Sequence, residues 1–207
     1  MKITLFTSDK IRHNYLINLL YKISDKLFVV QECSSITPDI MSSNCIMSPT
    51  IKKYFENVNI AQSKLFGKSF INNLKRNIKI LPIQAGDLSK YPMDLLLDFL
   101  KSDIYIVYGS SYIKGDLSNF LVERRAINIH AGVSPYYRGS ACNFWALYDD
   151  NSHLAGSTIQ LLSKGLDNGP ILYHSMSNIN TNPFEYTMST VKSAFHSLAE
   201  RIKDNSL

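Results

Sequence analysis

The sequence predicts an α/β protein with a Rossmann-like, open and mostly parallel sheet flanked by helices. Short runs rich in β-branched and aromatic residues alternate with segments whose apolar residues recur every three or four positions. The first such set, at 2–7, 11–23 and 26–32, has the pattern strand, helix, strand. Two strands joined by a helix pair in parallel in most folds. With 207 residues, 45% of them hydrophobic, the chain is long enough to bury a sizeable core.

The same alternation predicts the remaining elements. Helices are expected at 50–66, 92–102, 143–150 and 183–203, and strands at 77–83, 103–109, 125–131, 154–163 and 169–176. Ser8 or Asp9 is expected to cap the first helix. Asn182 is expected to cap the last, because Pro183 and Glu185 follow it at the first and third helical positions.

Residues 34–74 interrupt the strand–helix rhythm. They begin with the polar stretch "SSITPDIMSSN" and are expected to form a loop followed by the helix at 50–66, which ends near Gly67. The chain shows no internal repeat and no low-complexity tract. We therefore expect residues 1–207 to form a single domain with a helical excursion at about 34–74.

The composition limits the kinds of ligand and the cellular compartment that we expect for this protein. The formal charge of +5 and the pI of about 9.0 suit an anionic ligand, but the densest basic cluster is only "KRNIK" at 75–79, so a nucleic-acid partner is not expected. Cys33, Cys45 and Cys142 lack metal-ligand spacing and indicate free thiols in a reducing compartment. No signal peptide or membrane-length apolar run is present. We expect a soluble cytoplasmic protein without a metal.

Two polar residues stand at the end of the strand expected at 125–131. Asn128 and His130 are two positions apart, so they face the same side of the sheet, and ligands of open parallel sheets bind beyond the carboxyl ends of the strands. An amide can donate to a developing oxyanion, and an imidazole can move a proton near neutral pH. Taken alone, the pair favours a structural role, with Asn128 bonding the next turn and His130 buried in the core.

A carboxylate in the segment "SKGLDNGPIL" at 163–172 changes that balance. Asp167 lies between Gly165 and Gly169, in a turn that follows one expected strand and precedes another. Such an aspartate is usually a turn former. If its strand lay beside the strand of Asn128 and His130, the carboxylate would support a positive charge on His130 and position a water for proton transfer.

The stretches "NIHAGVSPYYRGSACNFWAL" at 128–147 and "GSTIQLLSKGLDNGPIL" at 156–172 resemble the folate-dependent formyltransferases. That family includes the glycinamide ribonucleotide, methionyl-tRNA and sugar-nucleotide N-formyltransferases. Its pattern is Asn-x-His, a Pro-containing loop with Tyr-Arg-Gly, and Leu-Asp-x-Gly before a strand. The resemblance is sharpest over residues 103–173 and implies the formyltransferase fold. It also implies 10-formyltetrahydrofolate as the formyl donor.

The resemblance assigns roles to particular residues. Asn128, His130 and Asp167 match the catalytic triad. The loop "YGSSYI" at 108–113 and the Asp167 loop would enclose the pterin. The expected folate-binding residues are Ser110, Ser111, Tyr112, Ile113, Gly165 and Leu166. An acceptor amine would attack the formyl carbon while Asn128 and protonated His130 stabilise the oxyanion. Asp167 would support that charge and relay the amine proton through water.

The chain departs from the family pattern in two places. Gln160 stands where some members carry a histidine that can titrate. The turn "TSDKIRHNYL" at 7–16 lacks the glycines of the phosphate loop in the ribonucleotide-modifying members, but its basic residues lie where a helix N-terminus could bind an anion. The expected acceptor-binding residues are Ser8, Asp9, Lys10, Arg12, His13, Arg138 and Gln160.

These departures favour one acceptor by elimination. The altered turn disfavours glycinamide ribonucleotide, and the methionyl-tRNA members carry a C-terminal domain beyond the length of this chain. A nucleotide-linked amino sugar remains. Two alternatives stay open: a hydrolase that releases formate from 10-formyltetrahydrofolate, and a non-catalytic nucleotide- or RNA-binding module of the same fold. The hydrolases of the family carry an N-terminal regulatory domain, whereas the first strand here follows Met1 directly. A homodimer is possible.

Overall fold

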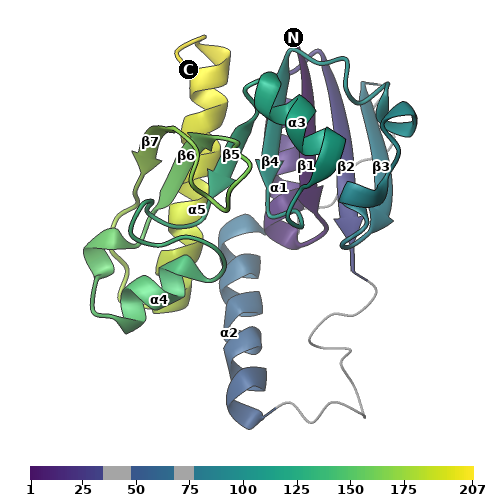
Figure 1. Cartoon of the computed structure of the whole chain (residues 1–207). Helices are drawn as coiled ribbons and strands as arrows, with labels where there is room; N and C mark the ends of the chain where they lie inside the picture. Colours follow the sequence, from purple (N-terminus) through teal and green to yellow (C-terminus); the bar gives the residue numbers. More distant parts are fainter. Residues whose placement is uncertain (35–47, 68–76) are drawn as a thin grey trace.

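The protein is described by a computed structural model that covers residues 1–34, 48–67 and 77–207. Its strands are β1 (Lys2–Ser8), β2 (Lys26–Cys33), β3 (Ile78–Gln84), β4 (Ile104–Tyr108), β5 (Ile127–His130), β6 (Ser157–Leu161) and β7 (Ile171–Ser175). They form one sheet in the order β3-β2-β1-β4-β5-β6-β7. The first five pair in parallel, and β6 and β7 join antiparallel. The expected open, mostly parallel sheet is confirmed (Figure 1).

Helices cover both faces of this sheet. They are α1 (Ile11–Tyr21), α2 (Pro49–Phe66), α3 (Gly115–Glu123), α4 (Cys142–Tyr148) and α5 (Pro183–Lys203), with short 3₁₀ turns η1 (Leu88–Lys90), η2 (Met93–Leu96) and η3 (Ser152–Leu154). The core between the sheet and α1 and α5 includes Leu16, Ile17 and Phe195, all fully buried. A second core lies under α3 and the 3₁₀ turns η1 and η2. Burial on both faces explains why the central strands are continuous apolar runs.

The α2 helix projects past the carboxyl ends of the parallel strands, packed on α5 and α1 (Figure 1). Its N-cap Ser48 accepts from the backbone N–H of Ile51 (3.3 Å), and it ends at Gly67 in the left-handed region (φ 62°). Lys192 on α5 donates to the Leu65 carbonyl (2.6 Å) and closes the last turn. The expected helix in the 34–74 excursion is confirmed. The stretch at 35–47 that was expected to form the loop, with Cys45, lies outside the described residues, as do positions 75 and 76 of the basic cluster.

The prediction of an α-helix at 92–102 is wrong. The segment forms the 3₁₀ turn η2 and then irregular turns. The Phe99 carbonyl accepts from the Thr4 hydroxyl (2.5 Å), and the Leu100 carbonyl accepts from the Tyr105 hydroxyl (2.6 Å). These two hydrogen bonds hold the last residues of the segment against β1 and β4. Local helix propensity is therefore overridden by contacts from β1 and β4.

Two further details differ from expectation. The N-cap of α1 is Lys10, and no side chain caps this helix, because Ser8 still belongs to β1 and the Asp9 carboxylate accepts from the Ser34 N–H (3.2 Å). The α3 helix is not among the predicted elements. Its signal is short, since only Leu117, Ser118 and Leu121 are buried. By contrast, Asn182 caps α5 as predicted, accepting from the N–H groups at the second and third helical positions.

Candidate active site

The site forms where the sheet changes from parallel to antiparallel pairing. The strand β5 pairs in parallel with β4 on one side and antiparallel with β6 on the other. It delivers Asn128 and His130 to the carboxyl edge of the sheet. Because β6 runs antiparallel to β5, it ends with Leu161 opposite Ile127 at the start of β5, and the loop from β6 to β7 folds back toward Asn128 and His130. Asp167 lies in that loop, 39 residues from Asn128 along the chain.

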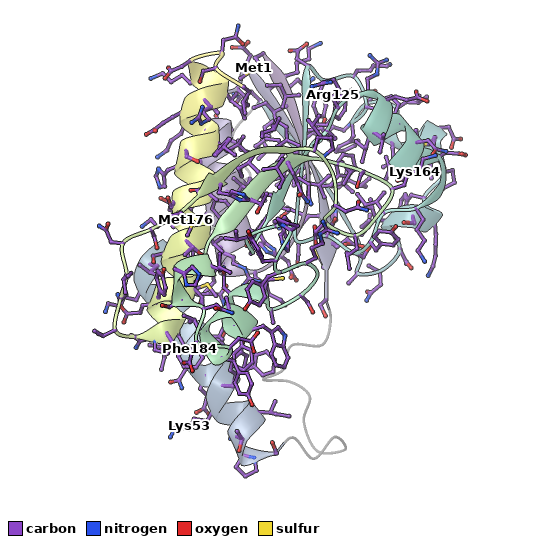
Figure 2. All side chains as sticks on the ribbon, turned by 60° about the vertical axis from the view of Figure 1, so that its left-hand side comes forward. Met1, Lys53, Arg125, Lys164, Met176 and Phe184 are labelled. Carbon is purple, nitrogen blue, oxygen red and sulfur yellow. The ribbon has the colours of Figure 1, made fainter. Side chains whose placement is uncertain are left out.

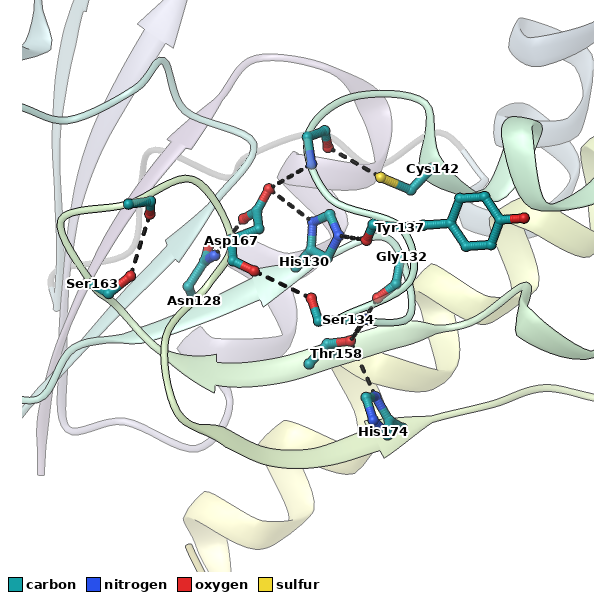
Figure 3. Close-up of polar contacts among 12 residues, drawn as sticks. Asn128, His130, Gly132, Ser134, Tyr137, Cys142, Thr158, Ser163, Asp167 and His174 are labelled. Carbon is teal, nitrogen blue, oxygen red and sulfur yellow. Dashed lines mark hydrogen bonds and ion pairs between the residues drawn. The ribbon is translucent and has the colours of Figure 1, made fainter.

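In the expected triad, Asn128 and His130 both contact the carboxylate of Asp167 (Figure 3). Asn128 Nδ2 donates to Asp167 Oδ1 at 2.9 Å, and His130 Nδ1 lies 3.2 Å from Asp167 Oδ2. The backbone N–H of Gly139 donates to the same Oδ2 at 3.1 Å. Asp167 has left-handed backbone geometry (φ 46°), which non-glycine residues seldom adopt. The left-handed turn orients the carboxylate toward β5.

His130 is held from both sides of its ring. Its Nε2 lies 2.8 Å from the Tyr137 carbonyl, opposite the Asp167 carboxylate at Nδ1. Both partners only accept hydrogen bonds, so a doubly protonated ring satisfies both contacts. The side chain of His130 is 4% exposed and that of Asp167 14%. The geometry therefore suits an imidazolium–carboxylate pair beside a neutral amide donor, shielded from bulk water.

Thr158 on β6 fixes the loop that follows β5. Its hydroxyl donates to the Gly132 carbonyl (2.6 Å) and accepts from the Ser134 N–H (2.9 Å). His174 Nδ1 lies 3.1 Å from the same oxygen. Since the one hydroxyl proton points at Gly132, His174 must donate. This places His174 in a structural role and anchors the loop that carries Tyr137 and Gly139 over the triad.

Gly169 explains the glycine of the Leu-Asp-x-Gly pattern. A Cβ at this position would overlap the backbone carbonyl of Leu161. The close approach lets the Leu161 N–H donate to the Pro170 carbonyl at 2.9 Å. The loop that carries Asp167 thus closes tightly between β6 and β7.

A cavity of about 1050 Å³ opens beside the triad. All six expected folate-binding residues line it: Ser110, Ser111, Tyr112, Ile113, Gly165 and Leu166. They come from the loop after β4 and the loop between β6 and β7. The Tyr112 hydroxyl donates to the Lys164 carbonyl and joins the two loops directly.

Glu32 is a contributor that the sequence did not reveal. This buried residue at the end of β2 accepts from the Ser111 N–H (2.5 Å), the Ser111 hydroxyl (2.6 Å) and the Gly86 N–H (2.9 Å). One carboxylate therefore ties the loop after β4 to the turn after β3. An acidic residue closing the apolar run "KLFVVQE" was the available signal, because a buried charge needs partners.

The turn between β1 and α1 reaches the cavity only in part. Ser8, Lys10, Arg12 and His13 line it, whereas Asp9 and the exposed Arg138 do not. The Arg12 guanidinium donates to the Tyr108 hydroxyl through Nε (3.1 Å) and to Gln62 Oε1 through Nη1 (2.6 Å). Arg12 therefore spans from the sheet to α2, across one wall of the cavity.

Three buried side chains with polar groups also line the cavity: His13, Gln160 and Cys142. Neither ring nitrogen of His13 has a hydrogen-bond partner, and burial followed by the charge of Arg12 holds its pKa well below the usual range. Gln160, opposite Asn128 in the β5–β6 pairing, has no partner for its Oε1. Burial and the neighbouring Asp167 raise the pKa of the Cys142 thiol to about 11. Cys142 is thus a protonated thiol, unsuited to act as a nucleophile at neutral pH.

Fold and site together define an α/β protein with a cavity beside clustered Asn, His and Asp side chains, and such a cluster suits oxyanion stabilisation and proton transfer. Comparison with known proteins makes the assignment specific. The formyl transferase family model matches residues 87–203, which include the whole triad. The chain belongs to the formyl transferase family.

The relatives with curated names are methionyl-tRNA formyltransferases. One from Trichodesmium erythraeum is 25% identical in an alignment of 142 residues that covers 62% of this chain and 42% of that protein. One from Thermodesulfovibrio yellowstonii is 35% identical over 86 residues, which is 42% of this chain and 27% of that protein. The matched region therefore spans less than half the length of each of these relatives.

Solved structures show the same fold at low identity. A phosphoribosylglycinamide formyltransferase from Anaplasma phagocytophilum aligns with a TM-score of 0.62 at 13% identity, over 99% of this chain and 86% of that one. A sugar N-formyltransferase from Shewanella aligns at 0.59 and 16%, over 99% and 69%. A formyltransferase from Anoxybacillus kamchatkensis, in complex with UDP-4,6-dideoxy-4-formamido-L-AltNAc and tetrahydrofolate, aligns at 0.54 and 19%, over 100% and 78%.

In the part of the chain that the structure describes, no helix is both long and apolar enough to cross a membrane. The expectation that no metal takes part stays a prediction.

Proposed function

We propose that the protein transfers the formyl group of 10-formyltetrahydrofolate to a primary amine. The observation that supports this most is the shared carboxylate: Asn128 Nδ2 and His130 Nδ1 both lie within 3.2 Å of Asp167, at the wall of a cavity. An amide donor and a buried cation side by side favour a reaction in which negative charge develops on one oxygen.

The reaction follows from these groups. The amine nitrogen attacks the formyl carbon, and the carbonyl oxygen becomes an oxyanion that accepts from Asn128 Nδ2. The positive charge of His130, held by Asp167, stabilises the same oxygen. The attacking amine loses a proton, which is passed through water beside Asp167 to N10 of the folate. The bond between the formyl carbon and N10 then breaks, and the oxyanion collapses to the new formamide.

The cavity has the chemistry that a folate needs. Val107 and Ile113 are buried residues of its wall, where a flat pterin ring can pack. The two loops joined by Tyr112 and Lys164 offer backbone groups for the ring's alternating donors and acceptors. Glu32 holds one of these loops in place. We propose that the pterin lies between them.

We propose a nucleotide-linked amino sugar as the acceptor. The α1 N-terminus has no side-chain cap, and Lys10 and Arg12 line the cavity beside it. Free helical N–H groups and fixed cations favour a phosphate there. The Anoxybacillus enzyme, whose bound ligand is a nucleotide-linked formamido sugar, shares this fold. Gln160 remains a candidate contact for the acceptor, whereas Asp9 and Arg138 do not face this cavity.

The proposal also covers the domain organisation, the compartment and the partners of the protein. We propose that the 207 residues act as one catalytic domain in the cytoplasm, where the Cys33 and Cys142 thiols stay reduced. Neither a membrane nor a nucleic acid is a partner in this proposal, and assembly into a homodimer is open to measurement.

The proposal is tested by incubating the protein with 10-formyltetrahydrofolate and a panel of amines. The panel contains UDP- and dTDP-linked amino sugars, glycinamide ribonucleotide and methionyl-tRNA, and each is examined for a formyl mass increment. A nucleotide-linked amino sugar should gain the formyl group. Formylation of methionyl-tRNA or glycinamide ribonucleotide alone would overturn the acceptor assignment. Full folate turnover without any amine would replace the transferase by a hydrolase.

A further inference from the structure

One end of the cavity is walled by aromatic rings from three helices. The aromatic wall consists of Tyr54 and Phe55 on α2, Phe144 and Tyr148 on α4, and Phe184 on α5, and all five line the cavity. Figure 2 shows Phe184 at the start of α5, near the projecting part of α2 that carries Lys53. Neither the triad nor the expected folate loops contribute to this wall.

The rings brace one another from different directions. Tyr54 meets Phe144 edge to face, with centroids 5.7 Å apart and an interplanar angle of 88°, and it meets Phe184 at 5.6 Å and 60°. Phe144 and Tyr148 are nearly parallel, at 6.1 Å and 19°. The edge-to-face and tilted contacts of Tyr54, and the 6.1 Å spacing of Phe144 and Tyr148, leave ring area free. Phe144 is 38% exposed and Tyr148 71%.

Fold stability does not account for these exposed rings. Within the described residues, the three buried core clusters and the residues packed against them include none of the aromatic wall. Exposed aromatic residues that line a cavity are typical of sites that stack a planar ligand, since every nucleobase has a flat face that can stack, offset, on an aromatic side chain.

A cation lies between this wall and the triad. Arg12 contacts Tyr108 next to β5 and Gln62 on α2. Gln62 follows Tyr54 by eight positions, which is about 12 Å along a helix. Arg12 is close enough to oppose the rise that burial causes in the Tyr54 pKa. The cavity therefore presents, in order, the triad, a fixed positive charge and a face of aromatic rings.

We infer that the aromatic wall is a subsite for the nucleobase of the acceptor, with Tyr148 and Phe144 as its stacking platform. This inference rests on the proposed function, because it names the far end of the molecule whose amine meets the triad. An amine at one end, an anion in the middle and a planar ring at the other end match the order of groups along the cavity. The other planar ring that could enter is the aminobenzoyl ring of the folate, and binding measurements separate the two.

The test measures ligand affinity by calorimetry, with no formyl transfer required. The probes are UDP, dTDP, GDP and ADP, with pyrophosphate as the ligand that lacks a base and 5-formyltetrahydrofolate as the folate. The variant is Tyr148→Ala, and its matched control is Tyr136→Ala. Tyr136 is 69% exposed, almost the same as Tyr148, but does not line the cavity. Phe144→Leu serves as a second variant of the wall.

At least one nucleoside diphosphate should bind more tightly than pyrophosphate. Tyr148→Ala should weaken that binding about tenfold or more, as expected for loss of a stacking partner. Tyr136→Ala should change it less than about twofold, because exposed substitutions away from a site have small effects. Affinity for pyrophosphate and for 5-formyltetrahydrofolate should stay unchanged in every variant.

Two results would overturn the inference. No preference for a nucleoside diphosphate over pyrophosphate would remove the base subsite. Loss of folate affinity but not nucleotide affinity in Tyr148→Ala and Phe144→Leu would assign the wall to the folate. Neither result depends on catalysis. Failure of the base subsite is therefore distinguishable from failure of the transferase proposal, which the formylation of the amine panel tests.

Discussion

Replacing Asp167 by asparagine should remove most of the turnover and leave the fold intact. In the native protein one carboxylate accepts from Asn128 Nδ2, His130 Nδ1 and the Gly139 N–H. Asparagine offers one accepting oxygen and one donating NH₂ group. If its NH₂ faces His130, only an unprotonated Nδ1 can accept from it, while Nε2–H still donates to the Tyr137 carbonyl. The substitution therefore exchanges an imidazolium for a neutral ring of the same shape.

The size of the effect follows from the charged hydrogen bonds that the substitution removes. A hydrogen bond to a charged group contributes about 1.5–3 kcal/mol, and ~1.4 kcal/mol corresponds to a factor of ten. Removing one stabilising group at a developing oxyanion typically costs ~100- to 1000-fold in rate. We expect kcat to fall at least about 100-fold. The KM for 10-formyltetrahydrofolate should change little, because the loops that would hold the pterin keep their bonds to Glu32 and Lys164.

The assay is the initial rate of tetrahydrofolate release with the amine that the panel identifies. Asp150→Asn is the matched control, because Asp150 is also left-handed (φ 58°) but is exposed and does not line the cavity. Thermal unfolding of both variants reports on folding. A folded Asp167→Asn protein with turnover within about threefold of the Asp150→Asn control would refute the role of the carboxylate, since the predicted loss is ~100-fold.

Two other substitutions test the support of the site. Glu32→Gln should weaken binding of 5-formyltetrahydrofolate about tenfold with little change in kcat, because it removes charge-assisted bonds to the loop of Ser111; unchanged affinity in a titration would contradict this. His13→Phe should reduce the acid sensitivity of the fold. The native pKa of His13 is lowered by burial, so the unfolded chain binds the extra proton and stability is lost as the pH falls below ~6.5, by at most about 1.4 kcal/mol per pH unit. Urea unfolding at pH 7.5 and 5.5 should show the smaller loss in the variant; equal losses in both proteins would show that His13 titrates normally.

Much of the fold was predictable because its signals are local. The predicted start of α5 was correct because Asn182 and Pro183 act on the backbone next to them. The prediction of a helix at 92–102 was wrong because the apolar spacing there is helical, whereas the end of the segment is held by the hydroxyl of Thr4, which lies 95 residues away along the chain. A composition pattern does not report such tertiary hydrogen bonds.

The candidate site was likewise predictable where its signals are local and not where its contacts join distant parts of the chain. The two-residue period of a strand was enough to pair Asn128 with His130. Asp167 is 39 residues from Asn128, so the sequence connected them only through a supposed neighbouring strand and through the family resemblance, and the antiparallel β5–β6 pairing supplies that strand. Glu32 escaped prediction because its partners come from the turns after two other strands. Asp9 was assigned to the site by proximity in sequence, but its carboxylate turns to the Ser34 N–H instead.

The contacts of the triad also indicate which of its two donors, Asn128 or His130, can donate a hydrogen bond to the formyl oxygen. His130 has no nitrogen to spare, because Nδ1 faces Asp167 and Nε2 faces the Tyr137 carbonyl. Asn128 gives only one of its two Nδ2 hydrogens to Asp167, and its side chain lines the cavity. The second hydrogen is therefore the donor that a formyl oxygen meets in this arrangement, and His130 acts on that oxygen through its charge. Direct donation from His130 would require the loop that carries Tyr137 to move, and with it the Gly139 N–H that holds Asp167. Because the same loop secures both residues, a ligand that displaced it would loosen the carboxylate at the moment its charge is needed. We propose that Asn128 supplies the direct contact to the oxyanion and that the His130–Asp167 pair supplies the electrostatic field around it.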